Sequence, residues 1–128
     1  MCRMVARELP GICYSVSATT RPPREGEVNG KDYIFLSEEE FKEWIDEGKF
    51  IEWAHVHRYY YGTPQEFLEE KLKAGAVVIM DLDVQGGLAI KKCYPDAVII
   101  FLITPSWEEL EARLRRRRTD TEEDIALR

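Results

Sequence analysis

The sequence lacks several features that mark whole classes of protein. No apolar stretch approaches the ~20 residues of a membrane-spanning helix. Arg3 and Arg7 interrupt the N-terminus, so the apolar core of a secretory signal is missing. The three cysteines of the sequence (Cys2, Cys13 and Cys93) are too few and too widely spaced for a disulfide framework or a thiolate metal site. We therefore expect a cytoplasmic protein without a membrane partner.

Positive charge is also in deficit, because 18 Lys and Arg face 24 Asp and Glu, for a formal net charge of -6. Nucleic acids and anionic membranes are not attracted by that balance, so we expect no nucleic-acid partner. Only two histidines occur, His55 and His57, on one face of a predicted strand, and two ligands without a third do not favour a metal site. The 128 residues suit a single domain, 1–128. The oligomeric state stays open.

Apolar spacing and turn residues predict helices that alternate with strands. Two capping-box patterns, Ser37 with Glu40 and Ser106 with Glu109, each open a predicted helix. A third predicted helix starts with Thr63 as its N-cap and ends near Ala74. Further helices are expected over 1–9, after the 81–87 segment and after Thr121, and strands over 12–16, 33–36, 50–56, 76–80 and 97–103.

The predicted fold class is α/β, with a parallel sheet flanked by helices. The runs 76–80 and 97–103 are continuously apolar, which is typical of strands buried on both faces of a parallel sheet. Residues 32–75 depart from this rhythm with short, aromatic, half-polar strands. We expect them to form a small antiparallel insert over the sheet edge.

A phosphate clamp is predicted between Ser17 and Tyr33. Arg21 and Arg24 offer two planar guanidinium groups, which suit phosphate oxygens, and the two prolines between them restrict the backbone. Ser17, and also Thr19 and Thr20, can add neutral donors. The alternative is a polar surface loop whose arginines are solvated.

Two carboxylates, Glu52 and Asp83, are candidates for recognising a base that carries adjacent N–H donors. Guanine has such a pair in N1–H and its N2 amine, whereas adenine has none. Thr63 could serve an acceptor such as O6. For Glu52 alone, an exposed strand residue remains the alternative. Asp81 and Asp83 follow a buried strand and precede glycines and a helix, a position where open α/β sheets bind ligands.

The arginine run 113–118 leaves two interpretations open: a solvated basic face, or a mobile lid whose arginines neutralise a transferring phosphoryl group. Tyr61 lies close to Thr63 in sequence and is a further candidate for ligand contact.

Six segments, in this order along the chain, together resemble guanylate kinase. They are S-V-S-A-T-T-R-P-P-R-E-G-E, V-N-G-K-D-Y, F-I-E-W-A, Y-Y-G-T-P, D-L-D-V-Q-G and R-L-x-x-R-x-T. The resemblance implies a P-loop-kinase-like fold with a GMP-binding insert at about 32–75 and a helical lid at about 113–128. It also implies transfer of a phosphoryl group from ATP to GMP, giving ADP and GDP, with Mg²⁺ on the nucleotide phosphates.

The resemblance further implies a role for each matching residue. Ser17, Arg21, Arg24, Tyr33 and Tyr61 would hold the GMP phosphate. Glu52, Thr63 and Asp83 would read the guanine, and Asp81 would lie near the metal. Arg113, Arg117 and Arg128 would act on the transferred phosphate.

The phosphate-binding loop of the family, G-x-x-x-x-G-K-[ST], is not found in the sequence; Gly26 to Lys31 gives a version one residue too short. We therefore expect an incomplete guanylate kinase with little activity of its own. Two alternatives are a guanylate-kinase-like protein-interaction module without catalysis, and a kinase for another nucleoside monophosphate. The guanine-reading set argues against the latter.

Overall fold

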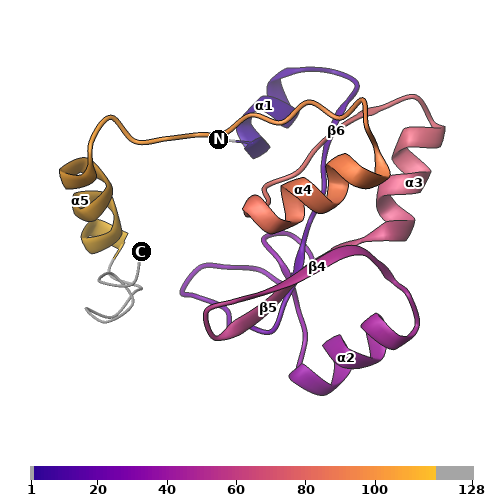
Figure 1. Cartoon of the computed structure of the whole chain (residues 1–128), viewed down its shortest axis with the longest axis horizontal. Helices are drawn as coiled ribbons and strands as arrows, with labels where there is room; N and C mark the ends of the chain where they lie inside the picture. Colours follow the sequence, from indigo (N-terminus) through magenta and orange to yellow (C-terminus); the bar gives the residue numbers. More distant parts are fainter. Residues whose placement is uncertain (1, 118–128) are drawn as a thin grey trace. The chain divides into compact units, whose positions relative to one another are not determined.

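The computed structural model describes residues 2–117, and the chain divides into two compact units (Figure 1). The first, Met1–Ala97, holds both sheets and four helices. The second, Val98–Arg128, holds one described helix, α5 (Trp107–Arg117). Within residues 2–117, no helix combines the length and apolarity that crossing a membrane requires.

A two-stranded parallel sheet forms one part of the first unit. β1 (Ile12–Tyr14) pairs with β6 (Val77–Ile79), with Cys13 opposite Val78. The helix α1 (Cys2–Glu8) packs against β1, and α3 (Gln65–Lys73) packs against β6. Because the strands are parallel, the segments that follow them emerge at the same edge, which is where open α/β sheets place their ligands.

The second sheet has four strands in the order β3-β2-β5-β4. β2 pairs with β3 in parallel and with β5 in antiparallel, and β4 pairs with β5 in antiparallel. The sheet is thus mixed, and β2 comes from the predicted clamp, before residue 32. Its strands are β2 (Ala18–Thr19), β3 (Ile34–Phe35), β4 (Phe50–Val56) and β5 (Tyr59–Pro64).

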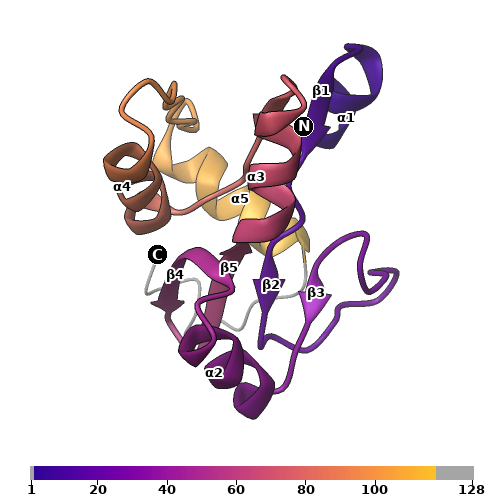
Figure 2. The same ribbon diagram turned by 90° about the vertical axis from the view of Figure 1, so that its right-hand side faces the viewer.

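The main buried core lies between this mixed sheet and α2 (Glu38–Asp46). Figure 2 shows α2 next to the strands of this sheet. Phe41 of α2 is fully buried and stacks on Phe50, with ring centroids 4.5 Å apart. A Cβ at Gly62 would lie 2.9 Å from a ring carbon of Phe50, so only glycine allows the strand to approach these rings. The predicted capping box is confirmed, because Ser37 accepts from the Glu40 amide and Glu40 accepts from the Ser37 amide.

Several predictions about local structure are wrong. Thr63 does not cap α3: its N-cap is Pro64, which makes no side-chain bond, and the Thr63 hydroxyl donates to Glu52 instead. His55 lies in β4, but His57 lies in the following turn with φ 55°, so the two histidines do not share a strand face. Strand β1 is also two residues shorter than expected.

The predicted strand over 97–103 is not formed either. None of the described strands pairs with it, and Val98, Ile100 and Ile103 are 84%, 77% and 80% exposed. Apolar content alone does not make a strand, because the backbone also needs a partner for its hydrogen bonds. The Ser106 hydroxyl does accept from the Glu109 amide at the start of α5. The helix predicted after Thr121 lies outside the described residues.

Candidate functional site

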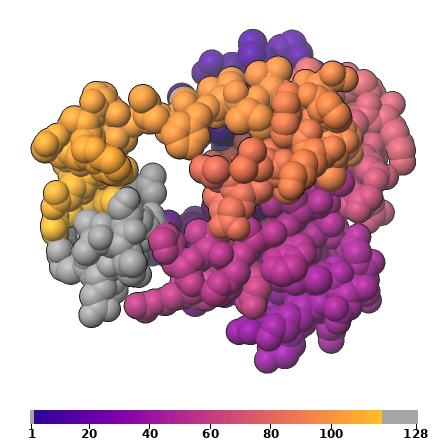
Figure 3. All heavy atoms as spheres, in the orientation of Figure 1, coloured from indigo at the N-terminus to yellow at the C-terminus, as the bar shows by residue number. Residues whose placement is uncertain are grey.

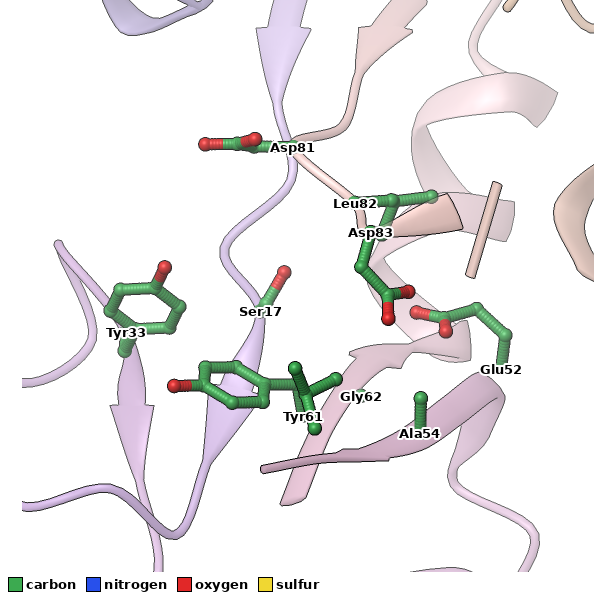
Figure 4. A pocket seen from close by; sticks show the side chains of 10 residues that line it. Ser17, Tyr33, Glu52, Ala54, Tyr61, Gly62, Asp81, Leu82 and Asp83 are labelled. Carbon is green, nitrogen blue, oxygen red and sulfur yellow. The ribbon is translucent and has the colours of Figure 1, made fainter. Parts of the chain in front are cut away.

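A cavity of about 250 Å³ lies within the first unit, where the parallel pair meets the mixed sheet. Figure 4 shows its polar side chains arriving from separate segments of the chain. Six predicted site residues line the cavity: Ser17, Tyr33, Glu52, Tyr61, Asp81 and Asp83, with Ala54, Val56, Gly62 and Leu82 between them. The structure thus brings these six residues together around one cavity.

The carboxylates of Glu52 and Asp83 point toward one another across one side of the cavity (Figure 4). Glu52 lies on β4 and is 8% exposed, while Asp83 caps α4 (Val84–Cys93), which packs against β4 (Figure 3). Burial raises the pKa of Glu52, and the nearby charge of Asp83 raises it further, although a hydrogen bond from Thr63 opposes both effects. The pair can accept two hydrogen bonds from one flat donor group.

Thr63 and Gly86 fix the Glu52 carboxylate from its two sides. The Thr63 hydroxyl is fully buried and donates to Oε1 of Glu52 at 2.5 Å, so its single hydrogen is already used. A Cβ at Gly86 would lie 2.8 Å from Oε2 of Glu52, so α4 comes this close only because residue 86 has no side chain. Asp83 is held by the same turn, since its Oδ1 accepts from the Gly86 amide at 2.8 Å.

Hydroxyl groups gather on the other side of the cavity. Ser17 follows β1, Tyr33 precedes β3, and Tyr61 lies on β5, with the two tyrosine rings 6.2 Å apart edge to face. Burial raises the pKa of Tyr33, and the charge of Asp81 raises it further, so its hydroxyl keeps its proton as a donor at neutral pH. The three hydroxyl groups can each donate a hydrogen bond to an anion, although the carboxylate of Asp81 lines the same cavity.

The predicted clamp arginines, Arg21 and Arg24, are not among the lining residues of this cavity. Arg21 is 9% exposed, and its guanidinium lies 5.3 Å from the centre of the Tyr33 ring. Its Nη2 donates to both carboxylate oxygens of Glu27, at 2.9 and 3.0 Å. The backbone amide of Arg24 donates to Glu27 as well, at 2.7 Å. Glu27 thus already accepts hydrogen bonds from both clamp residues.

Thr19 and Thr20, expected as possible phosphate donors, attach the clamp to β5 instead. The Thr19 hydroxyl donates to the Tyr60 carbonyl at 2.9 Å, and the Thr20 hydroxyl accepts from the Tyr60 amide at 3.0 Å. Thr19 also accepts from the Arg21 amide at 3.1 Å, which fixes the backbone where the clamp begins. Their role in this structure is to position Arg21.

The predicted lid arginines belong to the second unit. Arg113 lies on α5 in the second unit, where its Nε donates to Glu109 at 2.6 Å, and the backbone of Arg117 ends that helix. Arg128 lies outside the described residues. Over residues 2–117, no three His, Cys, Asp or Glu side chains are grouped so that they could hold a metal ion. Asp81 is an exposed carboxylate at the cavity edge.

Sequence reasoning missed two residues that shape this site, Glu27 and Gly86. Glu27 lies three residues after Arg24, a spacing at which a carboxylate can accept from a turn amide, and this signal was available. Gly86 lies three residues after Asp83, at the first turn of a helix where glycine has no local advantage. Glycine is needed at position 86 because Glu52, on the distant strand β4, lies against it. This contact is visible only in three dimensions.

Comparison with known proteins agrees with this geometry. A family model described as guanylate kinase matches residues 5–128. The chain belongs to the guanylate kinase family. A guanylate kinase from Caldanaerobacter subterraneus is 47% identical over 128 residues, which is 100% of this chain and 62% of the relative. One from Rubrobacter xylanophilus is 51% identical over 120 residues, covering 94% of this chain and 63% of the relative.

A solved structure supports the same family assignment. The crystal structure of guanylate kinase from Anaplasma phagocytophilum superposes with a TM-score of 0.78 and 39% identity, over 89% of this chain and 62% of that chain. The predicted α/β fold class is thereby confirmed. The chain spans about three fifths of the length of the guanylate kinases that it matches.

Proposed function

We propose that this guanylate kinase family chain binds GMP in the cavity, and that the protein transfers a phosphoryl group from ATP to GMP. The observation that carries the proposal is the pairing of two facing carboxylates, Glu52 and Asp83, with hydroxyl donors in the same cavity. A guanine base offers two adjacent donors to the carboxylates. The monophosphate would then reach Ser17, Tyr33 and Tyr61.

Base selectivity follows from the carboxylates. Guanine N1–H and its amine would each meet an acceptor, whereas adenine would place the lone pair of its own N1 against a carboxylate. A buried acceptor left without a donor costs about 1–3 kcal/mol, and more when it is charged. In this proposal Thr63 acts through Glu52, because its hydrogen holds that carboxylate in place.

The phosphate side requires a small rearrangement. Arg21 bonds Glu27 in this structure, and its guanidinium lies 5.3 Å from the centre of the Tyr33 ring. A phosphate dianion offers more negative charge than one carboxylate, so we expect the guanidinium groups of Arg21 and Arg24 to turn toward it when GMP binds.

Phosphoryl transfer would break the bond between the β–γ bridging oxygen and the γ-phosphorus of ATP and form a bond from a GMP phosphate oxygen to that phosphorus. The protein's part is positioning and charge neutralisation. Arg113, Arg117 and Arg128 are proposed for the second task. Mg²⁺ is held in such sites mainly by substrate phosphates with one or two carboxylates, and the exposed carboxylate of Asp81 suits that role. The ion would supply charge neutralisation on the phosphates.

The first test is a calorimetric titration of the chain with GMP and, separately, with AMP. We expect GMP to bind and AMP to bind at least a hundredfold more weakly. Equal binding of both would contradict the guanine assignment. A folded chain that binds neither would favour the protein-interaction alternative. Turnover of GMP with ATP and Mg²⁺ is the second test, and absence of turnover in the full-length protein would exclude the kinase proposal.

A further inference from the structure

A long-range contact outside the proposed binding residues ties α1 to the loop that carries Tyr33. One guanidinium nitrogen of Arg3 donates to Oδ1 of Asp32, and the other donates to the Asp32 carbonyl at 2.7 Å. The same guanidinium lies 5.1 Å from the centre of the Tyr14 ring. Arg3 therefore connects three segments: α1, β1 and the loop before β3. No binding role described above uses it.

Asp32 in turn closes the loop 28–33. Its Oδ2 accepts from the Val28 amide at 2.8 Å, and its own amide donates to the Val28 carbonyl at 2.9 Å. The Gly30 amide donates to the Tyr33 carbonyl at 2.8 Å. Asp32 is thus bonded on one side to the loop and on the other to Arg3. The residue after it is Tyr33, whose ring lines the cavity.

The contact between Arg3 and Asp32 is separated from the proposed binding cavity by the side chain of Tyr33. Tyr33 and Asp81 line the cavity described above and also a second one of about 220 Å³, which Arg3 and Asp32 help to line. A shift of the loop would move the Tyr33 hydroxyl, and with it the ring against which Arg21 lies. It would leave β4 and α4, which carry Glu52 and Asp83, where they are.

We propose that Arg3 and Asp32 are positioning residues for phosphate binding: they anchor the loop so that Tyr33 and Arg21 meet the phosphate of the nucleoside monophosphate. This inference rests on the proposed function. Neither residue touches the ligand. The two side chains are 33% and 24% exposed, so solvent still screens the ion pair and its contribution to global stability is expected to be modest. Its effect is therefore expected in the geometry of the site, where a displacement of about 1 Å costs up to a hundredfold.

The test compares two ligands that differ only in the phosphate. GMP is titrated by calorimetry and guanosine by heteronuclear NMR, into the full chain and into the variants Arg3→Ala, Arg3→Lys and Asp32→Asn. We expect Arg3→Ala and Asp32→Asn to weaken GMP binding about tenfold and to change guanosine binding less than twofold. Arg3→Lys, which keeps a charged donor group, should lose less GMP affinity than Arg3→Ala. The double variant Arg3→Ala/Asp32→Asn should bind GMP no more weakly than either single variant, because each substitution removes the same contact.

Arg7→Ala is the matched control, since Arg7 is an exposed arginine on the same helix. It should leave both ligands unaffected. Thermal unfolding of every variant separates local from global effects. Equal losses of GMP and guanosine binding, or a parallel loss of melting temperature, would assign the pair a purely structural role and overturn the proposal. Unchanged GMP binding would overturn it too. A wild-type chain that binds neither ligand would instead remove the proposed function itself.

Discussion

Glu27 and Arg21 form an ion pair in which the two side chains are only 19% and 10% exposed. The same carboxylate accepts from the backbone amide of Arg24, so one side chain contacts both arginine residues of the clamp. The clamp is therefore organised around an internal anion before any phosphate arrives. A ligand phosphate must share Arg21 with Glu27 or displace it.

This arrangement predicts a pH dependence of stability. Burial opposes ionisation of Glu27, but the hydrogen bonds from Arg21 and from the Arg24 amide outweigh it, so the pKa of Glu27 lies below its ordinary value. A depressed pKa means that the stabilisation is present above the unfolded-state pKa of about 4.3 and is lost as pH falls through the folded-state pKa. Glu27→Gln should cost about 1 kcal/mol at pH 7, in line with typical hydrogen bonds.

Urea unfolding of wild type and Glu27→Gln between pH 7 and pH 3 measures this effect. The difference between the two proteins should shrink at the acid end. Glu25→Gln is the control, because Glu25 is exposed in the same loop. A difference that stays constant down to pH 3 would show that the Glu27 carboxylate does not stabilise the fold through its charge.

Glu52 should show a trade-off between stability and binding. Its pKa is raised by burial and then by Asp83, so ionisation is less favourable in the folded chain than in the unfolded one. Its contribution is therefore most favourable at low pH and is lost as pH rises through the folded-state pKa. Glu52→Gln should raise the melting temperature at pH 7. It should also weaken GMP binding roughly 10- to 100-fold, the size expected for one hydrogen bond to a charged group.

The two measurements are differential calorimetry and GMP titration, with the exposed Glu66→Gln as control. A variant that loses both stability and GMP binding would show that the carboxylate is structural. One that gains stability and keeps full affinity would remove Glu52 from the guanine site.

Gly86→Ala tests the close approach of α4 to Glu52. The new Cβ would start 2.8 Å from Oε2, so the carboxylate must move away from Asp83. We expect GMP binding to weaken at least tenfold. The melting temperature should change little, because alanine favours a helix over glycine by about 1 kcal/mol and offsets part of the crowding. Gln85→Ala, exposed on the same helix, should bind normally. Wild-type affinity in Gly86→Ala would show that the carboxylate needs no fixed position.

The hairpin turn between β4 and β5 should accept a stabilising change. His57 adopts φ 55°, a left-handed conformation that a side chain disfavours and glycine does not. His57→Gly should raise the free energy of unfolding by roughly 0.5–1 kcal/mol. Gly48→Ala, at φ 66°, should lower it by a similar amount. Chemical denaturation of both variants checks the pair, and a destabilised His57→Gly would mean that the imidazole makes contacts worth more than the strain.

Local chemistry explains why much of the fold was predictable. The capping box at Ser37 and the strand Phe50–Val56 depend on neighbours within a few residues, and both form as expected. The proximity of Ser17 and Asp83 follows from the same kind of reasoning, because they come after the parallel strands β1 and β6, whose carboxyl ends share one edge of a sheet. Glu52 lies on the antiparallel strand β4, so this rule does not place it.

What the sequence could not supply depends on distant partners. The run 97–103 has the composition of a strand, but none of the described strands pairs with it. Threonine is a common N-cap residue, but the Thr63 hydroxyl donates its hydrogen bond to the buried Glu52 instead. The contact between Arg3 and Asp32 joins residues 29 positions apart, and nothing in the spacing of either residue indicates the other.

The buried core around Phe41, Phe50 and Ala18 has one further consequence, for how the molecule opens. The best-packed part of the first unit lies in the mixed sheet, whereas the parallel pair has only three residues in each strand. Amide hydrogen exchange should therefore be slowest in β4 and β5 and faster at Asp81–Asp83, beyond the end of β6. The side of the cavity formed by β4 and β5 would stay folded, whereas the side formed by Asp81–Asp83 would unfold locally and refold. GMP should then protect most strongly the amides of the side that opens.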